Sequence, residues 1–162
     1  MKKKIQKPDD LAKICKRLKQ EGKTIVFTNG CFDLLHSGHV HLFREAKKRG
    51  DVLIVAVNDD ASVEKVKGPA RPIFPLQERL EILEAIDVID YLTFFSQRTP
   101  QKIISQLLPD VLVKGGDWKV EKVVGKKEVE DAGGEVVIIP YLEGRSTSDI
   151  LERIIHAAAR KK

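Results

Sequence analysis

Short apolar runs recur along the chain and are separated by longer stretches of mixed polarity. Residues 52–57 are apolar without a break, which is typical of a central strand buried on both faces of a parallel sheet. Four other short runs predict strands at 24–27, 91–95, 111–113 and 136–139. Because helical segments alternate with these strands, the pattern indicates βαβ units. We therefore expect an α/β protein with a Rossmann-like, doubly wound sheet of about five parallel strands and helices on both faces.

The stretches between these runs place apolar residues at helical spacing. Residues 9–21 follow an i, i+3, i+4, i+7 pattern and predict an amphipathic helix that ends at Gly22. Thr99 and Pro100 are typical of an N-cap and the first position of another helix. Residues 58–75 are predicted to form a polar loop. Further helices are predicted over 38–49, 76–86, 121–132 and 150–158.

Length and composition indicate one globular domain. The 162 residues are too few for two domains of ordinary size, so we assign 1–162 to a single domain with residues 1–22 as an N-terminal helical extension. No apolar run approaches the roughly 20 residues that cross a bilayer, and none follows the basic start. We expect a cytoplasmic protein with no membrane partner. Cys15 and Cys31 are expected to be free thiols, because two cysteines make neither a disulfide framework nor a four-ligand zinc site.

The net charge indicates which kinds of partner the protein can bind. The formal net charge is +5, which suits a partner with several negative charges, such as nucleic acid or a polyphosphate. Only 6% of the residues are aromatic and the lysines are spread along the chain, so no stacking surface for nucleic acid is evident. We therefore expect no nucleic-acid partner, and a nucleic-acid-binding module is the weaker alternative.

The clearest motif lies at residues 28–39, between the first predicted strand and the next helix. His36 and His39 are three residues apart, so both rings can face one point at the start of that helix. Gly38 removes a side chain between them, and the free N–H groups and helix dipole favour an anion there. The motif predicts a phosphate site. The alternatives are one surface histidine and one packed histidine, or a metal pair, for which no third ligand is obvious nearby.

Two further clusters follow other strands. Lys65 and Lys67 place two ammonium groups where they can reach a triphosphate or a sugar phosphate; the alternative is a solvated loop. After the fourth strand, Gly116 allows a tight turn against a ligand. Asp117 can accept hydrogen bonds from a ribose or a base, and Trp118 offers a flat surface. The alternative for this second cluster is a turn with one packed indole.

A hydroxyl-rich string precedes the last predicted helix. Ser146, Thr147 and Ser148 combine hydroxyl side chains with the free N–H groups of a helix start, which suits a phosphate. A simple N-cap is the alternative.

Two of these strings resemble a known superfamily. His36-Ser37-Gly38-His39 after a strand resembles the His-x-Gly-His signature of the nucleotidyltransferases that include the cytidylyltransferases and the class I aminoacyl-tRNA synthetases. The wider string 27–40 resembles the cytidylyltransferase-like branch. Strings 67–72, 109–118 and 133–136 are similar to the adenylyltransferase domains of ADP-heptose synthases. Such domains are often fused to a sugar kinase, so this chain resembles a stand-alone form.

The resemblance implies a reaction and its partners. Such a domain transfers AMP from ATP to D-glycero-β-D-manno-heptose 1-phosphate, releases pyrophosphate and supplies ADP-heptose for the inner core of lipopolysaccharide. Mg²⁺ is expected with ATP, with no metal site made by the protein itself. A homo-oligomer is expected, with the N-terminal helix as a candidate contact. The alternatives are a cytidylyltransferase using CTP with glycerol 3-phosphate or ethanolamine phosphate, and a nucleotide-binding sensor without chemistry.

The resemblance also implies roles for individual residues. The expected catalytic residues are His36, His39 and Lys67. Asp33 is expected either to brace the phosphate loop or to contact magnesium indirectly, and Arg79 to brace the site or the nucleotide. Arg145 departs from the small or apolar residue of the closing motif. The nucleotide is expected to contact Thr28, Asn29, Gly30, Phe32, Asp33, Gly38, Arg79, Gly116, Asp117, Trp118, Ser146, Thr147 and Ser148. The acceptor is expected to contact Asp60, Lys65, Arg71 and Lys114.

Overall fold

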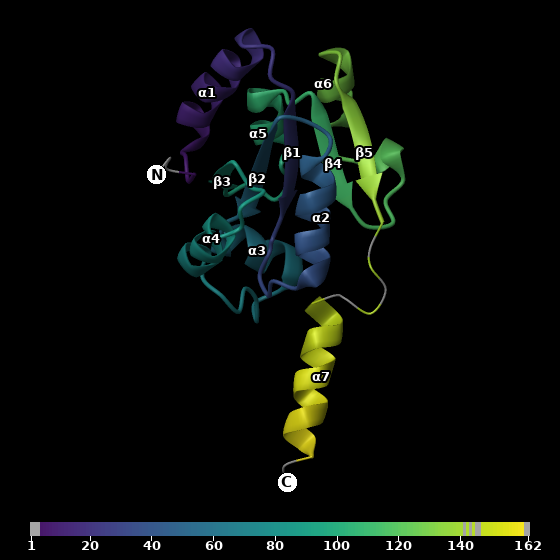
Figure 1. Cartoon of the computed structure of the whole chain (residues 1–162). Helices are drawn as coiled ribbons and strands as arrows, with labels where there is room; N and C mark the ends of the chain where they lie inside the picture. The colour runs from purple at the N-terminus through teal and green to yellow at the C-terminus, as the bar shows by residue number, and fades with distance from the viewer. Residues whose placement is uncertain (1–3, 141, 143, 145–146, 161–162) are drawn as a thin grey trace.

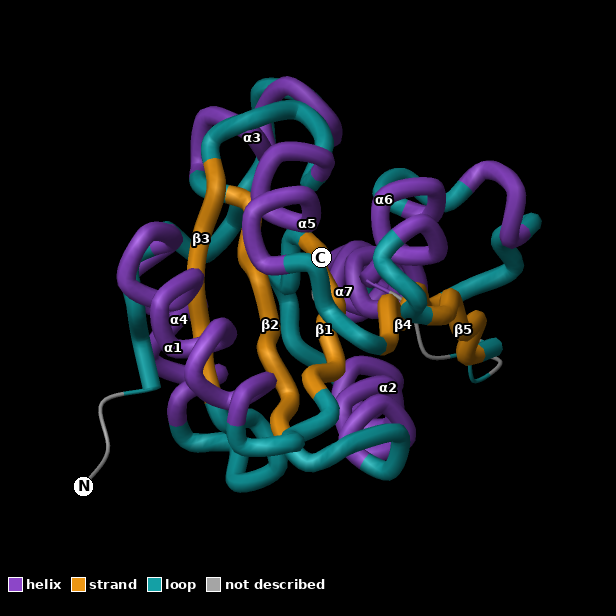
Figure 2. The backbone as a smooth tube through the Cα atoms, turned by 90° about the horizontal axis from the view of Figure 1, so that it is seen from above, coloured by secondary structure: helices purple, strands orange, loops and turns teal. Residues whose placement is uncertain are grey.

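Five parallel strands form one sheet with the order β3-β2-β1-β4-β5 (Figures 1 and 2). The structure is a computed structural model that describes residues 4–140, 142, 144 and 147–160. The α/β class and the parallel sheet predicted from the apolar runs are confirmed. The strands are β1 (Ile25–Gly30), β2 (Val52–Asn58), β3 (Tyr91–Phe95), β4 (Val111–Gly115) and β5 (Glu135–Ile139).

Helices cover both faces of the sheet, because alternate residues of each strand point to opposite sides. Ile25 and Phe27 of β1 pack in the cluster that includes residues of α1, α5 and α6. Val26 packs in the opposite cluster, which includes residues of α2 and α4. Every residue of β2 is buried, as its unbroken apolar sequence predicts. The helices are α1 (Pro8–Gln20), α2 (Ser37–Lys47), α3 (Asp60–Lys67), α4 (Leu76–Glu84), α5 (Gln101–Leu107), α6 (Lys126–Asp131) and α7 (Thr147–Ala159).

The segment predicted as a polar loop at 58–75 contains a helix, α3, so that prediction is wrong in its first half. Asp59 is the N-cap, and its carboxylate accepts a hydrogen bond from the N–H of Ser62 at 2.8 Å. Val63 is fully buried and anchors the helix. One buried apolar residue is too little for periodicity to reveal, whereas the capping aspartate was a usable signal.

Two predicted helix starts differ from the structure. The helix expected over 121–132 begins only at Lys126, after a short 3₁₀ turn at Val120–Lys122. Gly125 between them has a φ of +88°, which interrupts the helical path. The N-cap of α5 is Pro100 rather than Thr99, because the Pro100 carbonyl accepts the N–H of Ile104 at 3.0 Å.

The N-terminal helix belongs to the core. Leu11, Cys15 and Leu18 of α1 are buried against the sheet and α5. Its apolar side is therefore already covered, and the contact of a homo-oligomer expected at this helix stays a prediction. By contrast, α7 buries no residue and extends away from the sheet (Figure 1).

Among the helices of the described ranges, none combines the length and the apolar character needed to cross a membrane.

Candidate active site

The carboxyl ends of β1 and β4 lie side by side where the strand order reverses. β1 pairs with β2 on one side and with β4 on the other, and Thr28 of β1 pairs with Val113 of β4. In doubly wound sheets this edge is where ligands bind. The segment after β1, which carries the two histidines, and the segment after β4, which carries Trp118, therefore meet at the expected place.

Backbone hydrogen bonds orient the two histidine rings. The N–H of Gly38 donates to Nδ1 of His36 at 3.1 Å, and the N–H of His36 donates to Nδ1 of His39 at 3.4 Å. The rings stack with centroids 3.8 Å apart and an interplanar angle of 27°. Because each Nδ1 accepts a hydrogen bond from a backbone N–H, a neutral ring carries its own proton on Nε2. The pair thus offers two Nε2–H donors at the start of α2.

Both histidines are neutral near pH 7. Burial lowers the pKa of His39 to about 3, with a further contribution from the neighbouring His36. Burial also lowers the pKa of His36, against the opposing effect of Asp149 at the start of α7. The rings can therefore stabilise a phosphate as hydrogen-bond donors, but they do not bring positive charge to it.

Phe32 and Gly30 support His39. Phe32 is buried with a φ of +45°, and its ring meets the edge of His39 with centroids 5.3 Å apart. A Cβ atom on Gly30 would lie 3.0 Å from that ring, so the close approach favours glycine. Phe32 contacts His39 and Gly30 lies against Phe32, and the expected contact of both residues with nucleotide stays a prediction.

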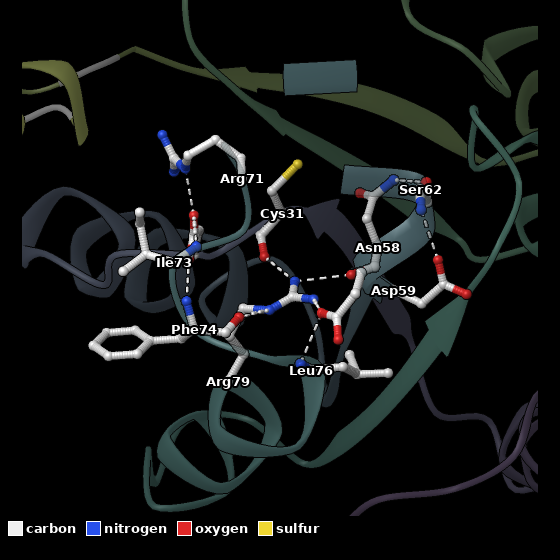
Figure 3. Close-up of polar contacts among 11 residues, drawn as sticks. Cys31, Asn58, Asp59, Ser62, Arg71, Ile73, Phe74, Leu76 and Arg79 are labelled. Carbon is white, nitrogen blue, oxygen red and sulfur yellow. Dashed lines mark hydrogen bonds and ion pairs between the residues drawn. The ribbon is translucent and has the colours of Figure 1, made fainter. Parts of the chain in front are cut away.

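Asp33 ties the β1 segment to the loop between α3 and α4. Its buried carboxylate accepts hydrogen bonds from the N–H groups of Ile73 and Phe74 at 2.9 Å and from Nε of Arg71 at 2.6 Å (Figure 3). Burial acts to raise the pKa of Asp33, but the two N–H groups and the guanidinium outweigh it and lower that pKa below its ordinary value. Of the two roles expected for Asp33, the geometry favours bracing.

Both carboxylate oxygens of Asp33 already accept hydrogen bonds from the protein. Across the described ranges, no three histidine, cysteine or acidic side chains gather closely enough to hold an ion.

Arg79 is the hub of the site's internal hydrogen bonds (Figure 3). It is fully buried, and Nη1 donates to the carbonyl oxygens of Cys31 at 2.5 Å and Asn58 at 2.8 Å. Nη2 pairs with Asp60 at 2.8 Å, and Nε donates to the carbonyl of Phe74 at 3.0 Å. One side chain thus joins the ends of β1 and β2 to the starts of α3 and α4. These contacts agree with the bracing role expected for Arg79, and the expected ligand contacts of Arg79 and Asp60 stay predictions.

The β4 side of the site is more open. Gly116 turns the chain with a φ of +117°, and its N–H donates to the carbonyl of Ile139 at 2.8 Å. Trp118 is 47% exposed, and Nζ of Lys114 lies 5.4 Å from its ring centre. Asp117 is exposed. An exposed indole and carboxylate are available to a ligand, in agreement with the turn predicted after the fourth strand.

The remaining expected residues fall into three groups. Lys65 and Lys67 are exposed in the last turn of α3. Thr147 and Ser148 begin α7, whereas Ser146 and Arg145 lie outside the described residues.

Asn29 is half-buried in β1, and Thr28 beside it is fully buried. Within the described ranges, Oγ1 of Thr28 has no hydrogen-bond partner. Sequence reasoning gave no role to Asp149, which acts on His36 from α7. The helix-start string that contains it was the available signal.

Comparisons with known proteins agree with this geometry. A profile of the cytidylyltransferase-like family matches residues 27–153. The chain is 51% identical over 154 residues to the bifunctional protein HldE of Geobacter metallireducens, covering 95% of this chain and 31% of that protein. It is 50% identical over 136 residues to the bifunctional protein HldE of Proteus mirabilis, covering 84% of this chain and 29% of that protein. The chain thus spans about a third of the length of these relatives.

Two solved structures share the fold. A lipopolysaccharide core biosynthesis protein from Thermoplasma volcanium has a TM-score of 0.61 and 30% identity, with 75% of this chain and 98% of that chain covered. A pantoate-β-alanine ligase from Francisella tularensis has a TM-score of 0.59 at 18% identity, with 84% and 66% covered, and shows the fold alone. With the histidine motif at the switch point of the sheet, these matches show that the chain belongs to the cytidylyltransferase-like family of nucleotidyltransferases.

Proposed function

We propose that the protein transfers AMP from ATP to D-glycero-β-D-manno-heptose 1-phosphate, releasing pyrophosphate and forming ADP-heptose. The observation that carries the proposal is the stacked pair His36 and His39, whose Nδ1 atoms are both occupied by backbone donors at the ligand-binding edge of the sheet. The identity to the HldE relatives and the likeness to a lipopolysaccharide core biosynthesis protein support the choice of sugar.

The proposed reaction is a direct displacement. An oxygen of the sugar phosphate attacks the α-phosphorus of ATP, and the bond from that phosphorus to the bridging oxygen of pyrophosphate breaks in line. Positioning and charge stabilisation dominate such chemistry, so no covalent nucleophile is needed. The Nε2–H groups of His36 and His39 donate to the α-phosphate as its oxygens gain charge. Their neutral state keeps both protons available as hydrogen-bond donors.

Further residues would bind the ATP molecule. Thr147 and Ser148, with Ser146 before them, would hold the β- and γ-phosphates at the start of α7. Asp117 and Trp118 would lie on the nucleoside side. Mg²⁺ would arrive with ATP and neutralise part of its charge.

A turnover assay tests the proposal. Pyrophosphate release is measured with ATP and with CTP, each against heptose 1-phosphate, glycerol 3-phosphate and ethanolamine phosphate. ATP with heptose 1-phosphate is expected to give the highest kcat/KM. Faster turnover with CTP and glycerol 3-phosphate would replace the proposal by the cytidylyltransferase alternative, and nucleotide binding without pyrophosphate release would indicate a sensor.

Self-association is a separate proposal. We propose that the protein forms a homo-oligomer, without α1 as the apolar contact, because that face is buried in its own core. Light scattering on a sizing column is expected to give a multiple of 18.2 kDa. A monomer mass across the concentrations used in the assay contradicts it.

A further inference from the structure

Three cations gather around Cys31 with little negative charge to balance them. Lys67 ends α3, Arg71 follows it in the loop, and Lys114 lies on β4. Within the part of the chain that the structure describes, neither Lys67 nor Lys114 forms an ion pair. Arg71 pairs with Asp33 through Nε, and no hydrogen bond within that same part uses its two Nη groups. A guanidinium group carries five N–H donors, so the engagement of the Nε edge of Arg71 leaves its Nη edge open to a ligand.

Cys31 marks the centre of this cluster. Its thiol points away from the carbonyl oxygen that accepts the hydrogen bond of Arg79 (Figure 3). Burial raises the pKa of Cys31, while Lys67, Arg79 and Arg71 oppose that rise. Lys114 is also within electrostatic reach of Cys31 and of Lys67. Lys114 lies on β4 and Cys31 directly follows β1, and the two strands pair through Val113 and Thr28.

The uncompensated positive charge of this cluster favours a bound anion. A partly buried ammonium group without a counter-ion is costly, and burial lowers the pKa of Lys114, with Lys67 adding to the effect. An anion between the three cations removes that cost. The reaction also needs positive charge here, because a phosphate must approach a triphosphate and both histidines are neutral.

We propose that Lys67, Arg71 and Lys114 form a pocket around Cys31 that binds the phosphate monoester dianion of the acceptor, with Lys114 as a specificity-determining residue. The inference rests on the proposed function, since it assigns the second substrate of that reaction to this pocket. Asp33 serves the pocket by holding the Nε edge of Arg71, which leaves the Nη edge for phosphate oxygens.

Steady-state kinetics of Lys114→Met tests the role of this lysine. The KM for heptose 1-phosphate is expected to rise roughly 10- to 100-fold, as for the loss of one charge-assisted hydrogen bond. The KM for ATP is expected to change by less than about 5-fold, because the proposed triphosphate contacts lie elsewhere and only the contact of Lys114 with the Trp118 ring is lost on the nucleoside side. Lys114→Arg retains the charge and should recover much of the acceptor affinity. Lys119→Met, an exposed lysine five residues along the chain, is the matched control and should change neither constant.

A second measurement does not depend on turnover. Alkylation of Cys31 by iodoacetamide is followed by mass spectrometry, with buried Cys15 as the internal reference. Heptose 1-phosphate, and inorganic phosphate at higher concentration, are expected to slow alkylation of Cys31 in the wild-type protein. In Lys114→Met the concentration needed for protection is expected to rise by the same factor as the KM.

The outcomes separate the two proposals. An unchanged acceptor KM in folded Lys114→Met, or alkylation that neither anion slows, overturns the pocket and leaves the proposed function standing. Absence of wild-type turnover with every sugar phosphate overturns the proposed function, while protection of Cys31 would still establish an anion pocket.

Discussion

At the scale of single residues, the histidine pair supplies two hydrogen-bond donors while both rings are neutral near pH 7. Backbone N–H groups occupy Nδ1 of His36 and His39, and burial lowers the pKa of both rings. The proposed phosphate site therefore gains hydrogen-bond donors from this pair, and other side chains are expected to supply its positive charge.

Replacing His39 by alanine is expected to reduce kcat by roughly 10²- to 10³-fold, because one preorganised donor to the reacting phosphate is lost. The circular dichroism spectrum should be unchanged. His41→Ala, two residues along the same helix, is the control and should retain near wild-type kcat. Near-normal kcat in His39→Ala would remove this ring from the mechanism.

The lowered pKa of His39 predicts a stability that depends on pH. In the unfolded chain His39 binds a proton below its ordinary pKa of 6.5. In the folded protein the same ring binds a proton only near pH 3. Folding is therefore most stable above pH 6.5 and loses up to about 1.4 kcal/mol per pH unit as the pH falls from that value. Urea unfolding from pH 7.5 to 4.5 measures this slope, and His39→Asn should flatten it. An equal slope in the variant would assign the effect to other groups.

At the scale of elements, the site is held by side chains that join strand ends to helix starts. Arg79 reaches from α4 to the carbonyl groups that end β1 and β2, and Asp33 reaches from the β1 segment to the loop before α4. These two residues therefore connect the segment that follows β1 with the loop between α3 and α4.

Replacing Arg79 by methionine is expected to lower the free energy of unfolding by roughly 2–4 kcal/mol, because buried carbonyl oxygens and Asp60 lose their donor. Arg79→Lys should recover little, since one ammonium group cannot span four acceptors. Thermal unfolding measures both, with exposed Arg98→Lys as the control. Wild-type stability of Arg79→Met would show that the network is not structural.

At the scale of the whole molecule, a packed sheet carries a helix that contributes nothing to its core. No described residue of α7 is buried, yet the helix starts beside His36, where Asp149 affects that ring. The folded core and the proposed triphosphate contacts of α7 therefore lie in different parts of the chain.

A chain that ends at Pro140 is expected to unfold cooperatively with a midpoint within about 4 °C of the full-length protein. ATP at 100 times its Kd stabilises a binding-competent protein by about 2.7 kcal/mol, and the shortened chain should lose most of that shift because Thr147 and Ser148 are absent. Differential scanning calorimetry with and without ATP measures both quantities. A full ATP shift in the shortened chain would exclude α7 from the triphosphate site.

The sequence by itself determined the parallel α/β sheet and the position of the histidine motif at its edge. Both follow from local patterns, since an unbroken apolar run such as 52–57 marks a buried strand and His-x-x-His at a helix start places two rings together. Only the tertiary structure decided what Asp33, Asp60 and Arg79 do, because their partners, apart from Phe74 close to Arg79, lie 16 to 48 residues away in the chain. Likewise, only the pairing of β1 with β4 brings the ammonium group of Lys114 within electrostatic reach of Cys31 and Lys67. The sequence does not show that this ammonium group lacks an ion-pair partner among the described residues.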